Sequence, residues 1–496
     1  MSGDRRTVRG LGSRVVEAWG PSGWPLIAVA ALTLGCAGDA TGPRGGVPTI
    51  DALTVESNPN NALSAVVQAR IGGADSAAVR FRTLAAGANE LTTPAVRLGP
   101  GVAGRNGAGG DVALLPVLGL EPVEVYSLSV VAWGRGGLAT SASLAFTTEP
   151  LPADLPSFAA GGPDPSPGFV VLAAGAYGLV IDNTGRVVWY RRFDNGPGLN
   201  FVAQPNGRYY ARPPPGDPSD PSAIAPWVEL DPLGEVLREI RCALGLQARF
   251  HDLIAGPDGD SWLLCDETRV MDLTPWGGVA DARVTGTNVQ HVSATGQLLF
   301  GWSPFDHFAI TDVDAAERAG PAVNWTHANA LDFDTDGDLL VSFRNLNEIT
   351  KIDVPTGAVI WRLGGLRNEF TFTATPMPAF VRQHGLRVHA PGSILLLDNA
   401  GDPSESRAER YEIDGATRTA QLSGSYGPAP GVITPFGGSV QDLPGGRTLA
   451  SFGTQGRVEE YDADGRLVWS IAGNPGYVFR AQRIGSLYSP GVGSPR

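Results

Sequence analysis

Gly185-Arg-Val-Val-Trp189 recurs twice later in the chain, as Gly357-Ala-Val-Ile-Trp361 and Gly465-Arg-Leu-Val-Trp469. Looser copies of this pattern of glycine, apolar residues and an aromatic begin at Gly234, Gly296 and Gly415. The copies follow one another roughly every 50 to 60 residues, which is the period of a repeated supersecondary unit. The sequence therefore predicts a repeat architecture in which each unit packs on its neighbours.

A second repeated element is a tight turn between two short apolar runs. It occurs at Pro205-Asn-Gly207, Pro257-Asp-Gly259, Asp336-Gly337, Pro391-Gly392 and Pro444-Gly-Gly446. Asn-Gly and Asp-Gly supply the positive φ angles that short hairpin turns require. Two hairpins per repeat give four strands, the blade of a β-propeller, and six closing copies predict six blades. A solenoid is less favoured, because it would need more uniform repeats and capping units.

The composition favours an all-β chain of more than one domain. The 496 residues include 66 glycines and 40 prolines, with 43 % apolar and 18 % charged residues. This abundance of turn formers, without long helical heptads, is typical of β-proteins, and the length exceeds that of most single domains. The net charge of −13 is spread without a basic block, which argues against nucleic acid or anionic lipid as a partner.

The predicted domain order is a small β-sandwich followed by the propeller. Residues 47–149 fit a sandwich, because strict alternation from Tyr126 onward marks a half-buried strand. Leu120-Glu-Pro-Val-Glu-Val-Tyr126, followed by Phe146-Thr-Thr148, resembles a fibronectin type III domain near its tyrosine corner. We expect a proline-rich linker at 150–160, the propeller at 161–480 and a C-terminal tail at 481–496.

The first 36 residues have the features of an export signal. A basic region precedes the apolar run 24–35, which is too short to cross a bilayer as a helix. The run ends in Leu32-Thr-Leu-Gly-Cys36, which resembles a bacterial lipoprotein cleavage box with Thr33 where leucine is usual. We predict lipidation of Cys36, a tether at 37–46, and an exported protein, periplasmic or anchored in the outer membrane. An ordinary secretory signal is the alternative, and membrane contact is expected only through the lipid.

Cys242 and Cys265 are the remaining cysteines. In an exported protein they could form a disulfide, and two isolated buried thiols are the alternative. No Cys-x-x-Cys or Cys/His spacing supports haem attachment or a structural zinc site. Asp334-Thr-Asp-Gly-Asp338 resembles part of a calcium loop but lacks the distant glutamate, so a plain hairpin turn is preferred. No metal is expected.

Three of the six histidines occupy the same place in successive repeats. His251, His327 and His384 each begin a strand-like run that ends in a glycine turn 8 to 10 residues later. Because the first strand of a propeller blade lines the central channel, we expect the three imidazoles to meet at one mouth of this channel.

The hairpin after each of these strands returns the chain to the level of the histidines. The returning positions hold Asp266, Arg344 and Asp398-Asn399, so Arg344 is predicted to lie near His327. Neutral imidazole can act as nucleophile, general base or metal ligand, and arginine offers donors that match phosphate or sulfate oxygens. Three histidines alone would suit a metal, but an adjacent cation repels one, which favours an oxyanion-transfer site.

Several separate motifs surround these residues. They are Phe250-His-Asp252, Asn324-Trp-Thr-His-Ala-Asn329, Asp336-Gly-Asp-Leu-Leu-Val-Ser-Phe-Arg344, Ile360-Trp-Arg-Leu-Gly-Gly365, and Arg382-Gln-His384 with Leu395-Leu-Leu-Asp-Asn399. Together they resemble the bacterial aryl-sulfate sulfotransferases, or arylsulfotransferases, and the resemblance covers most of residues 161–480. That family consists of exported six-bladed propellers with an N-terminal β-domain.

The resemblance implies an enzyme that transfers a sulfuryl group from an aryl sulfate ester to a phenolic acceptor. It implies a sulfohistidine intermediate, no nucleotide sulfate donor and no cofactor. The matching motif places the sulfated residue at His384, and the groups that bind sulfuryl oxygens at His251, His327 and Arg344. Asn329 is expected to assist in substrate binding. The chain departs from the family pattern at Gly385, so acceptor contacts are expected to differ.

Two other functions stay open at this point. A non-catalytic propeller that binds or scaffolds cell-envelope proteins would tolerate changes of the channel histidines. A metal-dependent hydrolase or lyase would use the three imidazoles as ligands. The sequence does not identify the physiological donor and acceptor, and it leaves open whether the chain forms a homo-oligomer.

Overall fold

The computed structural model describes residues 46–98, 112–215, 225–374, 379–400, 405–472 and 476–491. All of these residues belong to one compact unit, Gly45–Arg496. The predicted export signal and Cys36 lie outside the described residues. Within the described ranges, no helix has both the length and the apolar character needed to cross a membrane.

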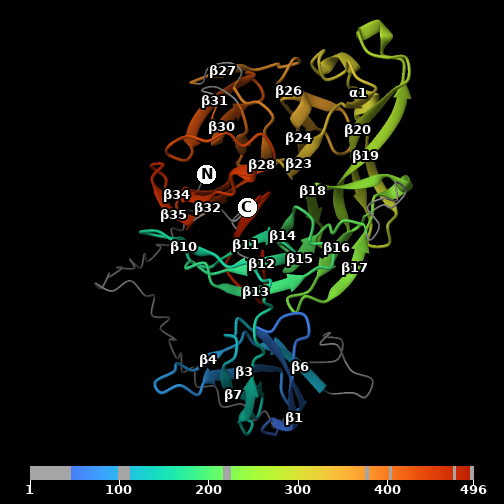
Figure 1. Ribbon diagram of the computed structural model, residues 1–496. Coiled ribbons are helices and arrows are strands. Elements are labelled where there is room, and N and C mark those ends of the chain that lie inside the picture. The colour runs from blue at the N-terminus through green and yellow to red at the C-terminus, as the bar shows by residue number, and fades with distance from the viewer. Residues whose placement is uncertain are drawn as a thin grey trace, which may run out of the picture. The chain divides into compact units, whose positions relative to one another are not determined.

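The N-terminal domain is a β-sandwich, as predicted (Figure 1). One sheet contains β1 (Thr49–Ser57), β2 (Ser64–Gly72) and β6 (Val112–Leu118). The other contains β3 (Ser76–Thr83), β4 (Leu91–Thr92), β5 (Val96–Arg97), β7 (Val125–Gly134), β8 (Gly137–Thr140) and β9 (Leu144–Thr147). Their facing apolar side chains, among them Val67 and Val130, form one core. The hydroxyl of Tyr126 accepts a hydrogen bond from the backbone N–H of Glu121 at 2.8 Å, the contact that defines a tyrosine corner.

The rest of the described chain forms six antiparallel sheets, the blades of the predicted propeller (Figure 1). Blade one, from the channel outward, contains β36 (Ala481–Ile484), β11 (Phe169–Ala174), β12 (Tyr177–Ile181) and β13 (Val187–Arg192). Blade two contains β14 (Phe201–Gln204), β15 (Arg208–Ala211), β16 (Trp227–Leu230) and β17 (Val236–Ile240). Blade three contains β18 (Gln247–Ala255), β19 (Ser261–Met271), β20 (Ala282–Val292) and β21 (Leu298–Trp302), with β22 (Ala322–Asn324) parallel to β20.

The remaining blades follow the same plan. Blade four contains β23 (Ala328–Phe333), β24 (Leu339–Phe343), β25 (Glu348–Ile352) and β26 (Val359–Gly364). Blade five contains β28 (His384–Ala390), β29 (Ser393–Asp398), β30 (Arg407–Asp414), β31 (Thr419–Tyr426) and β27 (Thr371–Thr373). Blade six contains β32 (Ser439–Leu443), β33 (Arg447–Ser451), β34 (Val458–Tyr461), β35 (Leu467–Ala472) and β10 (Ala159–Gly161). The helical turns are α1 (Pro304–His307), η1 (Ala243–Gly245), η2 (Thr274–Trp276), η3 (Ile310–Asp312), η4 (Arg344–Leu346) and η5 (Gly453–Gln455).

The propeller extends beyond its predicted bounds at both ends. Strand β36 pairs antiparallel with β11, from Phe169 opposite Ile484 to Leu172 opposite Ala481, and becomes the channel-lining strand of blade one. The expectation of a tail from residue 481 is therefore wrong. At the other end, β10 pairs with β35, so the expected linker already contains the start of a blade-six strand. Strands of three or four residues carry too few side chains to show an alternation in sequence.

The tryptophans of the repeated motif pack between blades. Trp189 and Trp469 are fully buried, and Trp361 is nearly so. The indole N–H of Trp189 donates to the carbonyl of Pro232 at 2.7 Å, and that of Trp469 to the carbonyl of Asn183 at 2.9 Å. Because a buried indole N–H requires an acceptor, each bond fixes a blade against a turn of the adjacent blade.

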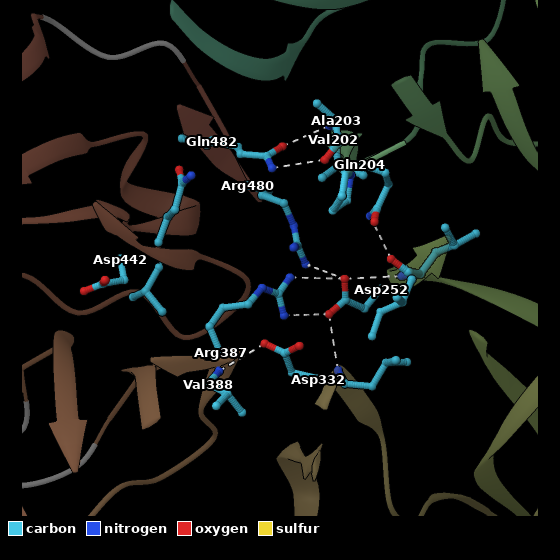
Figure 2. A pocket seen from close by; sticks show the side chains of 17 residues that line it. Val202, Ala203, Gln204, Asp252, Asp332, Arg387, Val388, Asp442, Arg480 and Gln482 are labelled. Carbon is cyan, nitrogen blue, oxygen red and sulfur yellow. Dashed lines mark hydrogen bonds and ion pairs between the residues drawn. The ribbon is translucent and has the colours of Figure 1, made fainter. Parts of the chain in front are cut away.

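Side chains of the innermost strands also bond to the backbone of the next blade (Figure 2). The amide of Gln482 exchanges two hydrogen bonds with the backbone of Ala203, at 2.9 and 3.0 Å. Similar bonds link Gln204 with Leu253, Asp252 with Leu331, Asp332 with Val388 and Gln441 with Arg483. They satisfy buried backbone groups and hold neighbouring strands in register around the channel.

The aspartate-rich turn of blade four contains its own cation. The ammonium of Lys351 lies 2.6 Å from a carboxylate oxygen of Asp334, also bonds to Asp336, and lies 3.8 Å from Asp338. A lysine that neutralises these carboxylates supports the predicted plain hairpin over a calcium loop.

Candidate active site

The three predicted histidines meet at one mouth of the channel. His251 lies within β18, His327 directly precedes β23, and His384 is the first residue of β28. The Nε2 atoms of His251 and His327 are 3.3 Å apart, and the ring centroids of His251 and His384 are 6.2 Å apart. The side chains come from blades three, four and five, so the predicted convergence is confirmed.

Unusual backbone conformations occur at or beside two of the three histidines. His327 has a φ of 50° and Arg382 a φ of 59°, values in the left-handed region that cost a non-glycine residue about 1–3 kcal/mol. Gly385, directly after His384, has a φ of +64°, and a Cβ there would lie 2.8 Å from the Cα of Ser439. Glycine is therefore needed at 385 because blade six passes close behind the histidine.

The surroundings of His384 determine which ring nitrogen carries the proton. Its Nδ1 lies 2.8 Å from Oδ1 of Asn399 and 3.0 Å from the carbonyl of Arg382. The amide nitrogen of Asn399 donates to the carbonyls of Thr434 and Gly437, so its oxygen must face the imidazole. Two acceptors at Nδ1 require an N–H there. The Nε2 of His384 consequently keeps its lone pair.

His251 and His327 are held in the opposite tautomer. The Nε–H of Arg249 points at Nδ1 of His251 at 3.3 Å, and arginine has no acceptor atom, so this Nδ1 accepts. Asn324 presents its amide nitrogen to Nδ1 of His327 at 2.6 Å. With Nδ1 accepting, each neutral ring carries its proton on Nε2, and the two Nε2 atoms lie 3.3 Å apart. Two N–H groups cannot hydrogen-bond to each other, so both can donate to one acceptor between them, such as an anionic oxygen.

Burial keeps all three rings neutral. It lowers the pKa of His384 to about 4. It also lowers the pKa of His251 and of His327 well below the usual range, and the charge of Arg249 is the next cause at both. The charge of Arg344 adds to the lowering at all three. Three neutral imidazoles, one with a lone pair on Nε2 and two with an N–H there, are thus present at physiological pH.

Arg344 lies at the mouth, as predicted. Its backbone N–H donates to the carbonyl of His327 at 3.0 Å, and its guanidinium donates to Asn345 at 2.8 Å and to the carbonyl of Pro435 at 3.2 Å. Burial lowers its pKa to about 10, so the side chain stays cationic. Arg382 donates to the same Asn345 oxygen at 2.9 Å, so one amide orients two cations.

Asn329 is fully buried behind the histidines. Its amide nitrogen donates to the carbonyl of Gln383 at 2.6 Å, in the segment that carries His384. This contact makes Asn329 a support of that segment, whereas its predicted contact with substrate stays a prediction.

Aromatic rings, which the sequence did not single out, border the imidazoles. Phe250 stacks on His251 with ring centroids 4.1 Å apart, and Phe479 lies edge-on to His251 and His384 at 5.6 and 6.3 Å. Further out, Phe436 is 57 % exposed under the guanidinium of Arg344, and Tyr477 is 36 % exposed. The mouth therefore combines polar donors with an apolar aromatic surface.

A buried ion cluster supports His251 from inside the channel. The carboxylate of Asp252 lies 2.9 Å from Arg387 and 3.1 Å from Arg480 (Figure 2). Arg480 also donates to the backbone carbonyl of His251 at 3.1 Å. These groups border an axial cavity of about 170 Å³ that all six innermost strands line. No repeat pattern marks Arg480, so sequence reasoning could not find it.

Cys242 and Cys265 form a disulfide with their Cα atoms 6.1 Å apart. It joins the segment after β17 to β19, which settles the alternative that the sequence left open. Asp266, the next residue on β19, pairs with Arg249 at 3.0 Å, and Arg249 contacts His251. The disulfide therefore anchors the strand that orients one of the site's donors.

The other histidines make contacts outside this cluster. His291 lies 2.6 Å from Asp260 and stacks on Trp262, while His307 stacks on Trp302. His389 pairs with Asp442 at 2.8 Å. Within the described part of the chain, no group of three or more His, Cys, Asp or Glu side chains is arranged to hold a metal ion.

Solved structures with a similar chain course include a protein of unknown function from Bacteroides caccae, with 13 % identity, a TM-score of 0.40, and coverage of 64 % of this chain and 98 % of the other. Virginiamycin B lyase from Staphylococcus aureus has 9 % identity and a TM-score of 0.34 over 62 % of this chain and 87 % of the other. The calcium-binding protein regucalcin from Agrobacterium tumefaciens has 15 % identity and a TM-score of 0.32 over 66 % and 92 %.

No curated protein matched the sequence. A family model did match, and its description is arylsulfotransferase (ASST). The matched segment, residues 247–474, begins with β18 and ends just after β35. It contains His251, His327, Arg344 and His384. Residues 247–474, just under half of the chain, thus match the arylsulfotransferase family.

Proposed function

We propose that this sulfotransferase moves a sulfuryl group from an aryl sulfate ester to a phenol through a covalent intermediate on His384. One arrangement carries the proposal: the contacts at the three Nδ1 atoms assign different tautomers to the imidazoles. His384 offers a lone pair at Nε2, while His251 and His327 offer N–H donors. A nucleophile beside preorganised donors is the arrangement that transfer of an anionic group requires.

In the first step, the lone pair on Nε2 of His384 attacks sulfur. An N–S bond forms, the S–O bond to the aryl group breaks, and its electron pair leaves with the phenolate. The ring then carries a positive charge, which strengthens the hydrogen bond from Nδ1 to Asn399. The N–H groups of His251 and His327 and the guanidinium of Arg344 stabilise negative charge on the sulfuryl oxygens.

In the second step, the oxygen of an acceptor phenol attacks the same sulfur. The N–S bond breaks and its electron pair returns to Nε2 of His384. The proton lost by the acceptor balances the proton taken up through water by the departed phenolate. The exchange therefore consumes no cofactor and no net proton.

The aromatic wall supports aryl groups as the leaving and accepting partners. Phe250 and Phe479 border the reactive nitrogens, and the exposed ring of Phe436 lies at the entrance. Aromatic surfaces favour offset or edge-on packing of a further ring, worth about 0.5–1.5 kcal/mol beyond its burial. Such packing would hold the phenyl ester beside His384.

An exported location, with Cys36 as a lipid anchor, forms part of the same proposal. The disulfide between Cys242 and Cys265 supports it, because disulfides persist in oxidising compartments such as the bacterial periplasm.

Turnover of 4-nitrophenyl sulfate with phenol as acceptor tests the activity. We expect wild-type protein to release nitrophenolate, and His384→Asn to lower kcat/KM by roughly 10³-fold or more. The matched control is His389→Asn, because His389 lies on the same strand but outside the cluster. Equal turnover by wild type and His384→Asn would contradict the assignment.

A further inference from the structure

An open groove of about 300 Å³ lies beside the histidine cluster in blade three, where residues of β18, β19, β20 and β22 line it. Strand β22 creates its wall, because it runs parallel to β20 and pairs Arg283 with Ala322 and Thr285 with Asn324. The groove is lined by Arg249, Asp266, Thr268, Arg283, Thr285 and Asn324, together with Ala322 and Val323.

Two of the lining residues reach the histidines directly. Arg249 contacts Nδ1 of His251, and Asn324 contacts Nδ1 of His327. The groove is therefore separated from two of the three imidazoles by a single side chain. A substrate that extends from the mouth past either side chain would lie next to the groove.

The groove carries an uncompensated positive charge. Arg249 pairs with Asp266 at 3.0 Å, which cancels one charge of each sign. Arg283 is exposed, and its guanidinium has no hydrogen-bond or ion-pair partner among the residues that the structure describes. The hydroxyls of Thr268 and Thr285, 2.8 Å apart, add hydrogen-bonding groups to the same wall. This positive charge is confined to the groove, whereas the whole chain carries a net charge of −13.

We propose that this groove binds a second anionic group, a carboxylate on the aromatic ring of the substrate, with Arg283 as its principal partner. The inference rests on the proposed sulfuryl transfer and narrows its substrates to phenolic acids and their sulfate esters. Because donor and acceptor exchange with the same nitrogen of His384, both rings approach from the same side. One groove therefore serves the ring in both steps.

The test compares two acceptors, 4-hydroxybenzoate and phenol, with 4-nitrophenyl sulfate as donor. We expect wild type to have the lower KM for 4-hydroxybenzoate. In Arg283→Gln, the ratio of the KM for 4-hydroxybenzoate to the KM for phenol should rise about tenfold or more. This rise is the loss expected for a hydrogen bond to a charged group. Arg283→Lys should restore most of the preference, because it keeps the charge.

Arg466→Gln is the charge-matched control, since Arg466 is exposed on a blade-six turn and pairs only locally with Asp462 and Asp464. It should leave the KM ratio at the wild-type value. An unchanged ratio in Arg283→Gln would overturn the inference while leaving sulfuryl transfer intact.

If no transfer occurs at all, calorimetric titration of 4-hydroxybenzoate into wild type and Arg283→Gln still decides the matter. Binding that weakens in the variant supports the groove, and equal or absent binding overturns it.

Discussion

At His384, the proposed catalysis depends on a proton that stays on Nδ1. Asn399 and the carbonyl of Arg382 bind the Nδ1–H, so the opposite nitrogen is available as a nucleophile in every molecule. Asn399 is itself fixed by its bonds to Thr434 and Gly437. This preorganisation removes the need to select one tautomer during each turnover.

The pH dependence of kcat/KM should reveal the buried state of this ring. Burial lowers the pKa of His384 in the folded protein to about 4, so the neutral nucleophile persists far below the ordinary histidine range. We expect kcat/KM to stay flat as pH falls through 6.5 and to decline only near pH 4. Stability changes in the same direction, since a histidine with a depressed pKa in the folded state favours unfolding progressively between about pH 6.5 and pH 4.

A pH–rate profile with 4-nitrophenyl sulfate measures this directly. Half-maximal kcat/KM near pH 6.5 would show that the nucleophile titrates as an exposed imidazole, contrary to the structure.

Replacing Asn399 isolates its positioning role. Asn399→Ala removes the acceptor at Nδ1, which carries positive charge in the intermediate. We expect kcat/KM to fall about 10- to 100-fold, the value of a hydrogen bond to a charged group. Because the bond to Asn399 raises the pKa of His384, the acid limb of the profile should also move to lower pH.

Asn399→Asp provides the contrast, since it keeps an acceptor and adds a negative charge. It should retain more activity than the alanine variant and move the acid limb to higher pH. Identical acid limbs in both variants would mean that Asn399 acts only through folding.

The repeated positions of the site were predictable from sequence, and the unrepeated ones were not. His251, His327 and His384 share a register, and Arg344 follows from the length of a hairpin. Arg249, Arg480 and Phe479 belong to no repeat, and tertiary structure alone brings them to the mouth.

At the scale of elements, the connections between strands shape the site more than the strands do. Strand β22 delivers His327 and forms the wall of the groove, and η4 carries Arg344. The disulfide between Cys242 and Cys265 joins blade two to blade three beside Arg249 and Asp266. Each of these features lies near the mouth of the channel.

Removing the disulfide should destabilise the fold. The bond closes a loop with a sequence separation of 23 residues, and loops of this size contribute about 2–4 kcal/mol to the free energy of unfolding. We expect the double variant Cys242→Ala, Cys265→Ala to unfold at a lower temperature than wild type in calorimetry. A reducing agent should lower the wild-type midpoint but not that of the variant. Equal midpoints for oxidised wild type and the variant would contradict a structural role.

Short and parallel strands limited what the sequence could predict at this scale. β22 and β27 each have three residues and pair in parallel with β20 and β31, so neither hairpin turns nor alternation reveal them. β36 pairs antiparallel with β11 and closes the ring, but its four residues are too few to show an alternation in sequence.

For the whole molecule, the six-bladed ring explains why residues far apart in sequence can form one site. Parallel innermost strands start at the same mouth, and the bonds between blades keep them in register. The ring was predictable because glycine turns recur along the chain and three copies of the repeated motif end in tryptophan. The ion pairs at the mouth were not predictable, because no repeat marks the partners in Arg249–Asp266 and Arg382–Glu317. Arg344 remains as a cation at the mouth of an acidic protein, and such a local positive charge attracts anionic substrates.

The most direct measurement is the mass of the protein after brief exposure to 4-nitrophenyl sulfate without acceptor, followed by fragmentation to locate the added group. We predict a gain of one sulfuryl group on His384, its disappearance when phenol is added, and no gain in His384→Asn. A wild-type protein that turns over the donor without any gain, or that carries the sulfuryl group on another residue, would contradict the account.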